Sequence, residues 1–361
     1  MARKMASGSK MSALRHRHRS SSIFRPGVMN MRCLNTRGGR LTLISGFCVL
    51  LIIIVTHNQM VYDVIVEDME VVRYKYQADR TNYICCDMLG GLGNLLFQYA
   101  FTLAMSLRFN MTMVCETDKI QTIQQMFDIP DCADDYKGLR LCFGEGAIKN
   151  KFNIGYDSKV GNMMLKRDTH FGGYFQSWLY WVKYEDTIRE HFTIKSDLKA
   201  SAENYIDASL QELGVENRSS VSLVGVHVRR GDLLNDFFRE HGYFVAPEEY
   251  FHKAMAYVTK RVPKPVVFVV SSNDMEWSQE VVKETNAVFL LNNTREFDFT
   301  VLTMCDHFIM SVGTFGWWVG WHIQGLVIYY NKPFRPDSEL SGVVTNDYVT
   351  TFAYPKWIGM S

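Results

Sequence analysis

Short apolar runs alternate with amphipathic stretches along most of the chain, beginning near residue 83. Apolar runs of this length predict strands, and stretches with apolar residues three or four positions apart predict helices. The predicted strands cover residues 83–88, 111–115, 221–228, 266–270, 287–291, 307–310 and 326–330. The predicted helices cover 95–108, the stretch around 251–258 and 274–285. Such alternation is typical of α/β proteins, in which helices cover both faces of a parallel sheet.

The first strand, helix and second strand form one predicted β-α-β unit over residues 83–115. A glycine-rich turn, Gly90-Gly-Leu-Gly93, lies at its first strand-to-helix junction. Ligands of open α/β sheets bind beyond the carboxyl ends of the strands. The residues that directly follow each predicted strand are therefore the candidate site.

Fifteen residues without a charge, 41–55, precede this pattern. A membrane helix usually needs about 20 apolar residues, but thin early secretory membranes accept shorter spans. Residues 1–40 carry ten Lys or Arg and no acidic residue, whereas four acidic residues lie within 63–70. The positive-inside rule then predicts a cytoplasmic tail, a single transmembrane signal-anchor helix and a stalk, with the remaining chain in the lumen. These segments are 1–40, 41–56 and 57–80.

Two other interpretations of the apolar segment are weaker. A cleaved signal peptide would have an h-region of this length, but its forty-residue n-region would be unusual and no Ala-x-Ala site follows. A buried core helix would normally show a polar face, and this segment has none.

Composition limits the classes of function. With 361 residues, of which 47% are hydrophobic, the chain can bury a sizeable core. We predict an N-terminal α/β domain over 81–215 and a C-terminal one over 216–361. Beyond residue 40 the chain carries 29 basic against 38 acidic side chains. Because a nucleic-acid binder would present a basic surface, we expect no nucleic-acid partner.

Six cysteines and three sequons follow the apolar segment and are compatible with a luminal location. Six cysteines allow 15 disulfide connectivities, which the sequence cannot rank. Occupancy of the sequons is equally open. The cysteines are Cys85, Cys86, Cys115, Cys132, Cys142 and Cys305, and the sequons begin at Asn110, Asn217 and Asn292.

The strand predicted at 221–228 ends in His227, Arg229 and Arg230. Two arginines at the end of an apolar strand are costly unless an anion or carboxylates neutralise them. Side chains alternate along a strand, so His227 and Arg229 share one face and Arg230 takes the other. We predict that Arg229 and His227 bind a pyrophosphate and that Arg230 braces the loop through a carboxylate. The alternative is that both arginines form structural ion pairs.

Two further strand ends carry polar residues. After the strand at 266–270, Ser272 and Asp274 cluster with an amide side chain. The Asp274 carboxylate can accept from N1–H and the 2-amino group of guanine, which would select guanine over adenine, or it can cap the following helix. After the strand at 307–310, small residues precede a helix whose free N–H groups suit phosphate oxygens. These residues are Ser311, Gly313, Thr314 and Gly316.

Taken together, these motifs resemble the galactoside alpha-1,2-fucosyltransferase family. They occur in that family's order and cover roughly residues 83–330. The motifs are Gly90-Gly-Leu-Gly-Asn94 with Phe97-Gln-Tyr-Ala100, Gly173-Tyr-Phe-Gln-Ser177, His227-Val-Arg-Arg-Gly-Asp232, Ser272-Asn-Asp-Met-Glu-Trp277 and Ser311-Val-Gly-Thr-Phe-Gly-Trp317. Leu95 departs from the family, which often has Gln at this position.

The resemblance implies a GT-B-like glycosyltransferase with two facing Rossmann-like domains, the N-terminal one on the acceptor side and the C-terminal one binding GDP-fucose. It implies a hexosyltransferase of the Golgi membrane, single-pass type II with a luminal catalytic domain. This enzyme would transfer L-fucose to the 2-hydroxyl of galactose, with inversion and without a metal. Acceptors would be galactose-terminated glycans of glycoproteins or glycolipids. The oligomeric state, monomer or homodimer, is left open.

Donor contacts are expected from both domains. Asn94, at the start of the helix predicted at 95–108, either contacts donor phosphate or fucose or caps that helix. For the general base we nominate Asp232, with Asp87 and Glu116 behind it. The predicted catalytic residues are Arg229, Asp232 and His227. The predicted donor-binding set is Arg229, Arg230, Asn94, Gly93, Asp274, Ser272, Ser311, Thr314, Phe315 and Gly316.

Two alternatives to this function remain. One keeps GDP-fucose and changes the acceptor, as in protein O-fucosylation or core alpha-1,6 transfer. The other is a catalytically inactive, glycan-binding scaffold of the same fold.

Overall fold

The computed structural model describes residues 82–130, 132, 148–149, 155–283, 286–338, 340–341 and 348–361. All of them belong to one compact unit, Arg80–Ser361. The predicted tail, membrane anchor and stalk lie outside the described residues. Within these ranges, no helix has both the length and the apolar character that a membrane crossing requires.

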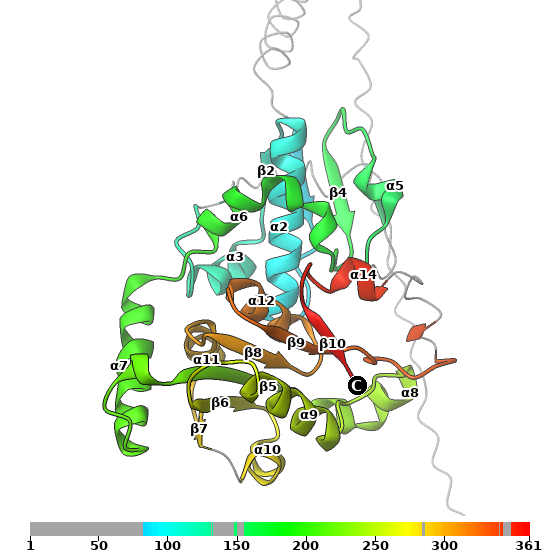
Figure 1. The fold of residues 1–361 in the computed structure, drawn as a ribbon. Helices are drawn as coiled ribbons and strands as arrows, with labels where there is room; N and C mark the ends of the chain where they lie inside the picture. Colours follow the sequence, from blue (N-terminus) through cyan, green and yellow to red (C-terminus); the bar gives the residue numbers. More distant parts are fainter. Residues whose placement is uncertain are drawn as a thin grey trace, which may run out of the picture. The chain divides into compact units, whose positions relative to one another are not determined.

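The N-terminal part of this unit holds a four-stranded parallel sheet (Figure 1). Helix α2 (Leu92–Phe109) joins its first two strands, so the predicted β-α-β unit is confirmed. The helix begins three residues earlier than predicted, because Gly90 turns the chain at a φ of 86° and Gly91 serves as the N-cap. The sheet order is β2-β1-β4-β3, with β1 (Tyr83–Cys86), β2 (Thr112–Met113), β3 (Ile148–Lys149) and β4 (Thr169–Gly172).

The C-terminal part holds a six-stranded parallel sheet, ordered β10-β9-β8-β5-β6-β7. From β5 the chain moves outward to β7, then returns to place β8 against the other side of β5. The strand order therefore reverses between β5 and β8, the point at which such sheets bind ligands. Five of these strands were predicted. Their bounds are β5 (Ser222–Val228), β6 (Val266–Ser272), β7 (Ala287–Phe289), β8 (His307–Met310), β9 (Val327–Tyr330) and β10 (Ile358–Met360).

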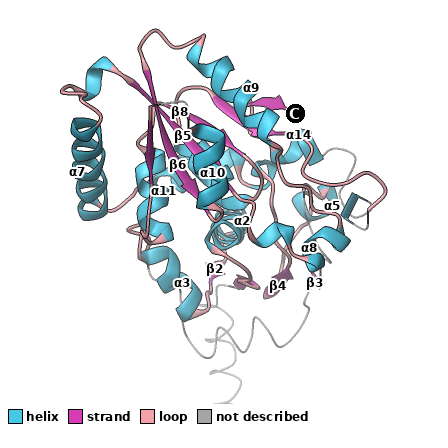
Figure 2. Cartoon of the chain, turned by 90° about the horizontal axis from the view of Figure 1, so that it is seen from below, coloured by secondary structure: helices cyan, strands magenta, loops and turns pink. Residues whose placement is uncertain are grey.

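Both faces of the larger sheet are covered by helices, as predicted (Figure 2). Val224, Val226 and Val228 of β5 pack in the cluster that includes α9 and α10, whereas Leu223 packs in the cluster that includes α11 and α12. This alternation places His227 on the α12 side. The helices are α9 (Glu248–Thr259), α10 (Met275–Val282), α11 (Arg295–Thr303) and α12 (Thr314–His322).

The two sheets lie on either side of the predicted boundary at 215/216, yet they share one hydrophobic core. Helix α2 packs against α12, and the ring centroids of Phe97 and Trp317 are 4.6 Å apart. Trp181 stacks on Trp318 at 5.6 Å. Large aromatic contacts of this kind bury much apolar surface, which joins the two halves firmly.

The carboxyl-terminal segment contacts both halves. In its first part, α14 (Tyr348–Phe352), the Thr351 carbonyl accepts a hydrogen bond from Ser177 Oγ. Directly after α14, the Ala353 carbonyl accepts one from Trp178 Nε1. The chain then returns to the larger sheet as β10, beside β9. No sequence pattern had predicted this course.

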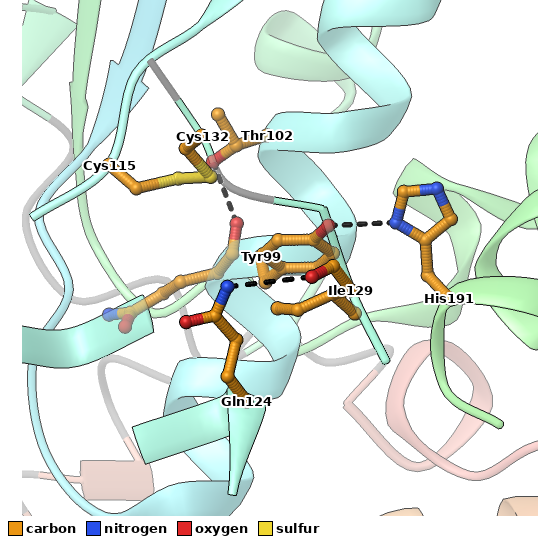
Figure 3. The surroundings of a disulfide bond; sticks show 8 residues. Tyr99, Thr102, Cys115, Gln124, Ile129, Cys132 and His191 are labelled. Carbon is orange, nitrogen blue, oxygen red and sulfur yellow. Dashed lines mark hydrogen bonds between the residues drawn. A yellow bond between two sulfur atoms is a disulfide. The ribbon is translucent and has the colours of Figure 1, made fainter. Parts of the chain in front are cut away.

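One disulfide among the described residues joins Cys115, which follows β2, to Cys132, 17 positions later in the sequence (Figure 3). Cys86 and Cys305 are buried free thiols. Close to the disulfide, Tyr99 on α2 hydrogen-bonds His191 Nδ1 at 2.7 Å. This hydrogen bond ties α2 to the segment that holds His191.

Candidate active site

The ends of β5 and β8 are tied together where the strand order reverses. The backbone N–H of Arg229 donates to Ser311 Oγ at 2.8 Å, and the N–H of Ser311 donates to the His227 carbonyl at 3.0 Å. Ser311 is buried. Its hydroxyl therefore serves the backbone of the β5 loop, and its role in donor binding stays a prediction.

Arg229 forms an ion pair within its own loop. Its Nη2 lies 2.8 Å from Asp232 Oδ2, and its Nε lies 3.3 Å from both oxygens of that carboxylate. The third nitrogen, Nη1, makes no hydrogen bond to any residue in the described part of the chain. It faces Gly313, where an added Cβ would come within 2.9 Å of it. The side chain is one-third exposed, so Nη1 is available to an anion.

Arg230 lies on the other side of the loop, against α10. Its Nε is 3.1 Å from Asp274 Oδ2, although the angles do not make a hydrogen bond. Its guanidinium carbon lies 4.4 Å from the centre of the Trp277 ring, which adds a cation–π contact. The structure thus places Arg230 where a bracing residue would be, and its role in donor binding stays a prediction.

Asn273 holds this loop in shape, and sequence reasoning did not single it out. Its Oδ1 accepts hydrogen bonds from the N–H groups of Arg230 (2.8 Å) and Gly231 (3.1 Å), and its Nδ2 donates to Asp232 Oδ1 at 2.8 Å. A Cβ on Gly231 would lie 2.6 Å from the Asn273 carbonyl oxygen, so only glycine fits there. In the sequence, Asn273 stood out only as an amide residue directly after a strand, and nothing indicated which groups it would bond.

Ser272 and Asp274 shape the turn between β6 and α10. Ser272 Oγ accepts from the Asp274 N–H at 2.9 Å and from Ser278 Oγ at 2.7 Å. Asp274 occupies the N-cap position, but its side chain makes no capping hydrogen bond. The capping interpretation of its carboxylate is therefore wrong, because that carboxylate pairs with Arg230 instead.

His227 is buried and neutral. Burial, followed by the positive charge of Arg229, lowers the pKa of His227 to about 3. Its Nδ1 is buried without a hydrogen-bond partner in the described chain, and its ring lies 5.0 Å from the ring of Phe315. A Cβ on Gly316 would approach Nδ1 to 2.8 Å, so this glycine makes room for the histidine. A neutral imidazole can offer a hydrogen bond to a ligand but no positive charge.

Asp298 on α11 is a second polar group that the sequence did not reveal. Its Oδ2 accepts from Ser271 Oγ at 2.6 Å, while its Oδ1 is buried without a partner among the described residues. Ser271 pairs with His227 across β5 and β6, so Asp298 and His227 belong to the same corner of the site. Burial raises the pKa of Asp298. The only signal was a carboxylate between two phenylalanines of an apolar helix.

Helices α2 and α12 begin next to each other at this site. Asn94 Oδ1 accepts from Thr314 Oγ1 at 2.8 Å and from Gln176 Nε2 at 2.9 Å. Gly91 holds the N-cap position of α2, so the interpretation of Asn94 as a cap is wrong. Asn94 instead joins the starts of two helices, whose first-turn N–H groups are favourable for a negative charge.

The three nominees for the general base are all in polar contacts or at helix starts. Although burial alone would raise it, the pKa of Asp232 is lowered because Arg229 and Asn273 hydrogen-bond its carboxylate. Asp87 accepts from His170 Nε2 at 2.7 Å, at the carboxyl edge of the smaller sheet. Glu116 stands at the N-cap position of α3 (Thr117–Gln124) without a side-chain cap. The choice among them stays a prediction.

A family model described as glycosyl transferase family 11 matches residues 50–360. Galactoside alpha-(1,2)-fucosyltransferase 1 of Saimiri boliviensis boliviensis is 32% identical over 207 residues, covering 56% of this chain and 54% of that protein. Galactoside alpha-(1,2)-fucosyltransferase 2 of Bos taurus is 33% identical over 193 residues, covering 52% of this chain and 54% of that protein. The chain thus spans about half the length of the curated relatives it matches.

Solved structures show weaker similarity. The crystal structure of NodZ alpha-1,6-fucosyltransferase soaked with GDP-fucose has a TM-score of 0.49 and 14% identity, covering 70% of this chain and 96% of that one. POFUT1 in complex with GDP-fucose has a TM-score of 0.44 and 12% identity, covering 70% and 98%.

Proposed function

Because the chain belongs to glycosyl transferase family 11, we propose that it transfers L-fucose from GDP-fucose to the 2-hydroxyl of a galactose residue on a glycan. The relatives at 32% and 33% identity, which are named galactoside alpha-(1,2)-fucosyltransferases, support this donor and linkage. The observation that carries the proposal is Arg229. Its Nη1 faces the Gly313 turn at the reversal point of a parallel sheet, where a diphosphate would bind.

The donor would lie across the ends of β5 and β8. Arg229 would bind the diphosphate, together with N–H groups at the start of α12. The guanine base would lie towards the buried corner of His227 and Asp298, because the Asp298 oxygen that has no partner among the described residues can accept from guanine N–H groups. Asp274 was predicted for that role, and its pairing with Arg230 favours Asp298 instead.

Transfer would proceed by a single displacement with inversion. The galactose 2-oxygen would attack C1 of fucose while the bond from C1 to the phosphate oxygen breaks, and that electron pair would leave with GDP. Arg229 would stabilise the charge that develops on the leaving phosphate, and we propose that no metal is needed there. The hydroxyl proton would pass to a base, for which Asp232 is the first nominee and the Asp87–His170 pair the second.

We propose that the protein is a type II membrane protein of the Golgi with its enzymatic part in the lumen. The basic residues before the apolar segment 41–56 and the acidic ones after it support this orientation. Addition of a glycan at Asn110, Asn217 or Asn292, measured by a mobility shift after glycosidase treatment, would test the luminal side.

The function is tested with GDP-fucose and a panel of galactosides, using the full chain. We expect labelled fucose to appear on β-galactosides, and linkage analysis to place it on the 2-hydroxyl. Transfer only to a folded peptide module, or only to a core N-glycan, would show a different acceptor. If GDP also fails to raise the melting temperature, the chain is not a GDP-fucose enzyme.

A further inference from the structure

A surface cavity of about 210 Å³ opens beside the loop that carries Arg229. Leu233 and Leu234, directly after Asp232, line one side, and Tyr243 and Phe244 line another. Arg335, in the segment that follows β9, also lines the cavity. The cavity therefore borders the loop at the carboxyl end of β5.

Backbone hydrogen bonds hold the walls of this cavity in place. The N–H of Phe244 donates to the Pro333 carbonyl at 2.8 Å, and the N–H of Arg335 donates to the Gly242 carbonyl at 2.8 Å. The Arg335 guanidinium donates to the carbonyl of Arg239, the last turn of α8 (Asp236–His241). The shape of the cavity thus exists before any ligand arrives.

The lining offers both surfaces that a sugar ring needs. Leu234 and Phe244 are each 40% exposed, and an exposed aromatic ring suits the apolar C–H face of a pyranose. The Tyr243 hydroxyl makes no hydrogen bond to a residue in the described ranges. Within the described part of the chain, the Arg239 guanidinium forms one ion pair, a 3.8 Å contact with the exposed Asp236. Hydroxyl and guanidinium donors of this kind suit the hydroxyl groups of a neutral sugar.

Leu233 connects the cavity to the reaction site, because it directly follows Asp232 in the chain. Burial raises the pKa of Tyr243, and the charges of Arg229 and Asp232 act on its hydroxyl, as does Tyr174 at the carboxyl edge of the smaller sheet. Neither Arg229 nor any residue of the smaller sheet lines the cavity itself.

On the basis of the proposed function, we propose that this cavity binds the sugar residue to which the acceptor galactose is attached. The reacting galactose must lie against the donor near Arg229, outside this cavity. Pockets for drug-sized ligands usually measure about 300–1,000 Å³. A cavity of about 210 Å³ is suited to one ring rather than to a long chain.

The test compares methyl β-galactoside with lactose, a galactose attached to glucose, in the full-length chain with GDP-fucose as donor. For the wild type we expect a lower KM for lactose. Phe244→Ala should raise the KM for lactose about tenfold, because it removes one apolar ring face. It should leave the KM values for methyl β-galactoside and GDP-fucose unchanged. Leu234→Ala should act in the same direction. Phe237→Ala is the matched control, since Phe237 is 61% exposed and outside the lining.

Direct binding of lactose in the presence of GDP is measured by NMR. This measurement distinguishes a failure of this inference from a failure of the proposed function. If the wild type transfers fucose to neither acceptor, the proposed function fails, while loss of lactose binding in Phe244→Ala would still support the cavity. Three results would overturn the inference. They are equal changes in KM for both acceptors in Phe244→Ala, unchanged lactose binding in that variant, and no lactose binding by the wild type.

Discussion

Gly93 of α2 lies directly against the backbone of Thr314 at the start of α12: a Cβ at position 93 would come within 2.4 Å of the Thr314 carbonyl carbon. The Gly93 carbonyl also accepts from Trp318 Nε1 at 3.0 Å. The two helices belong to different sheets. This contact therefore sets how closely the two halves of the site approach each other.

Gly93→Ala should destabilise the protein. The colliding atoms are backbone, which cannot rotate away, so we expect a loss of about 3 kcal/mol or more in the free energy of unfolding. Denaturant unfolding measures it. Gly91→Ala is the matched control, because nothing lies within 4 Å of its added Cβ and its φ is −81°. Equal stability of the two variants would contradict the close contact.

Arg229 and Arg230 should respond differently to substitution. Arg229→Lys should reduce kcat/KM by about a hundredfold with little change in melting temperature, because Lys cannot reproduce the planar guanidinium contacts with Asp232 and a phosphate together. Arg230→Met should mainly lower the melting temperature, since it leaves Asp274 without its cation. Steady-state kinetics and thermal melts on both variants measure this difference. Unchanged turnover in Arg229→Lys would remove it from the site.

The base-binding carboxylate can be identified by a pair of substitutions. We expect Asp298→Asn to raise the Kd for GDP about tenfold and to reduce discrimination against ADP, because an amide cannot accept from both guanine N–H donors in the same way. Asp274→Asn should leave GDP affinity nearly unchanged. Calorimetric titration of both variants with GDP and ADP measures the difference. The reverse result would restore the base-reading role to Asp274.

Stability should fall as the solution becomes acidic. An unfolded histidine has a pKa near 6.5, whereas that of folded His227 is about 3. Between these values the unfolded chain binds a proton that the folded protein does not, so the free energy of unfolding decreases as pH falls from about 6.5 towards 3. The lowered pKa values of His191, His307 and His322 act in the same direction.

His227→Gln should therefore flatten, without abolishing, the dependence of melting temperature on pH in that window. His252→Gln provides the control, since that side chain is about half exposed. Melting curves at several pH values compare the three proteins. A slope unchanged in His227→Gln would show that the buried imidazole is not the source.

The Cys115–Cys132 disulfide should contribute to stability. It closes a loop over a separation of 17 residues, for which chain-entropy estimates give about 3 kcal/mol. The double substitution Cys115→Ser/Cys132→Ser should therefore lower the melting temperature by roughly 6–12 °C. Differential scanning calorimetry measures the shift. A melting temperature equal to that of the wild type would mean that the bond adds nothing.

Local pattern was enough to predict most strands and the meeting of polar residues at their ends. The apolar runs that became β5 and β8 also identified His227, Arg229 and Ser311 as residues at strand ends. Parallel strands bring such ends to one edge of the sheet, so these residues meet. The strand-end position of Asn273 did not reveal its role, and Asp298 lies within a helix and could not be chosen in this way. Their roles depend on partners 41 and 27 residues distant in the sequence, namely Asp232 and Ser271.

The sequence by itself determined the α/β class, the cationic end of β5 and the glycines that permit close approach, because alternation, charge and missing side chains are local properties. Only the tertiary structure decided which carboxylate each arginine meets, that Asn94 bridges two helices, and that the carboxyl-terminal segment joins both sheets. Those outcomes depend on distances between residues far apart in the chain, which packing of the shared aromatic core sets and no local pattern contains.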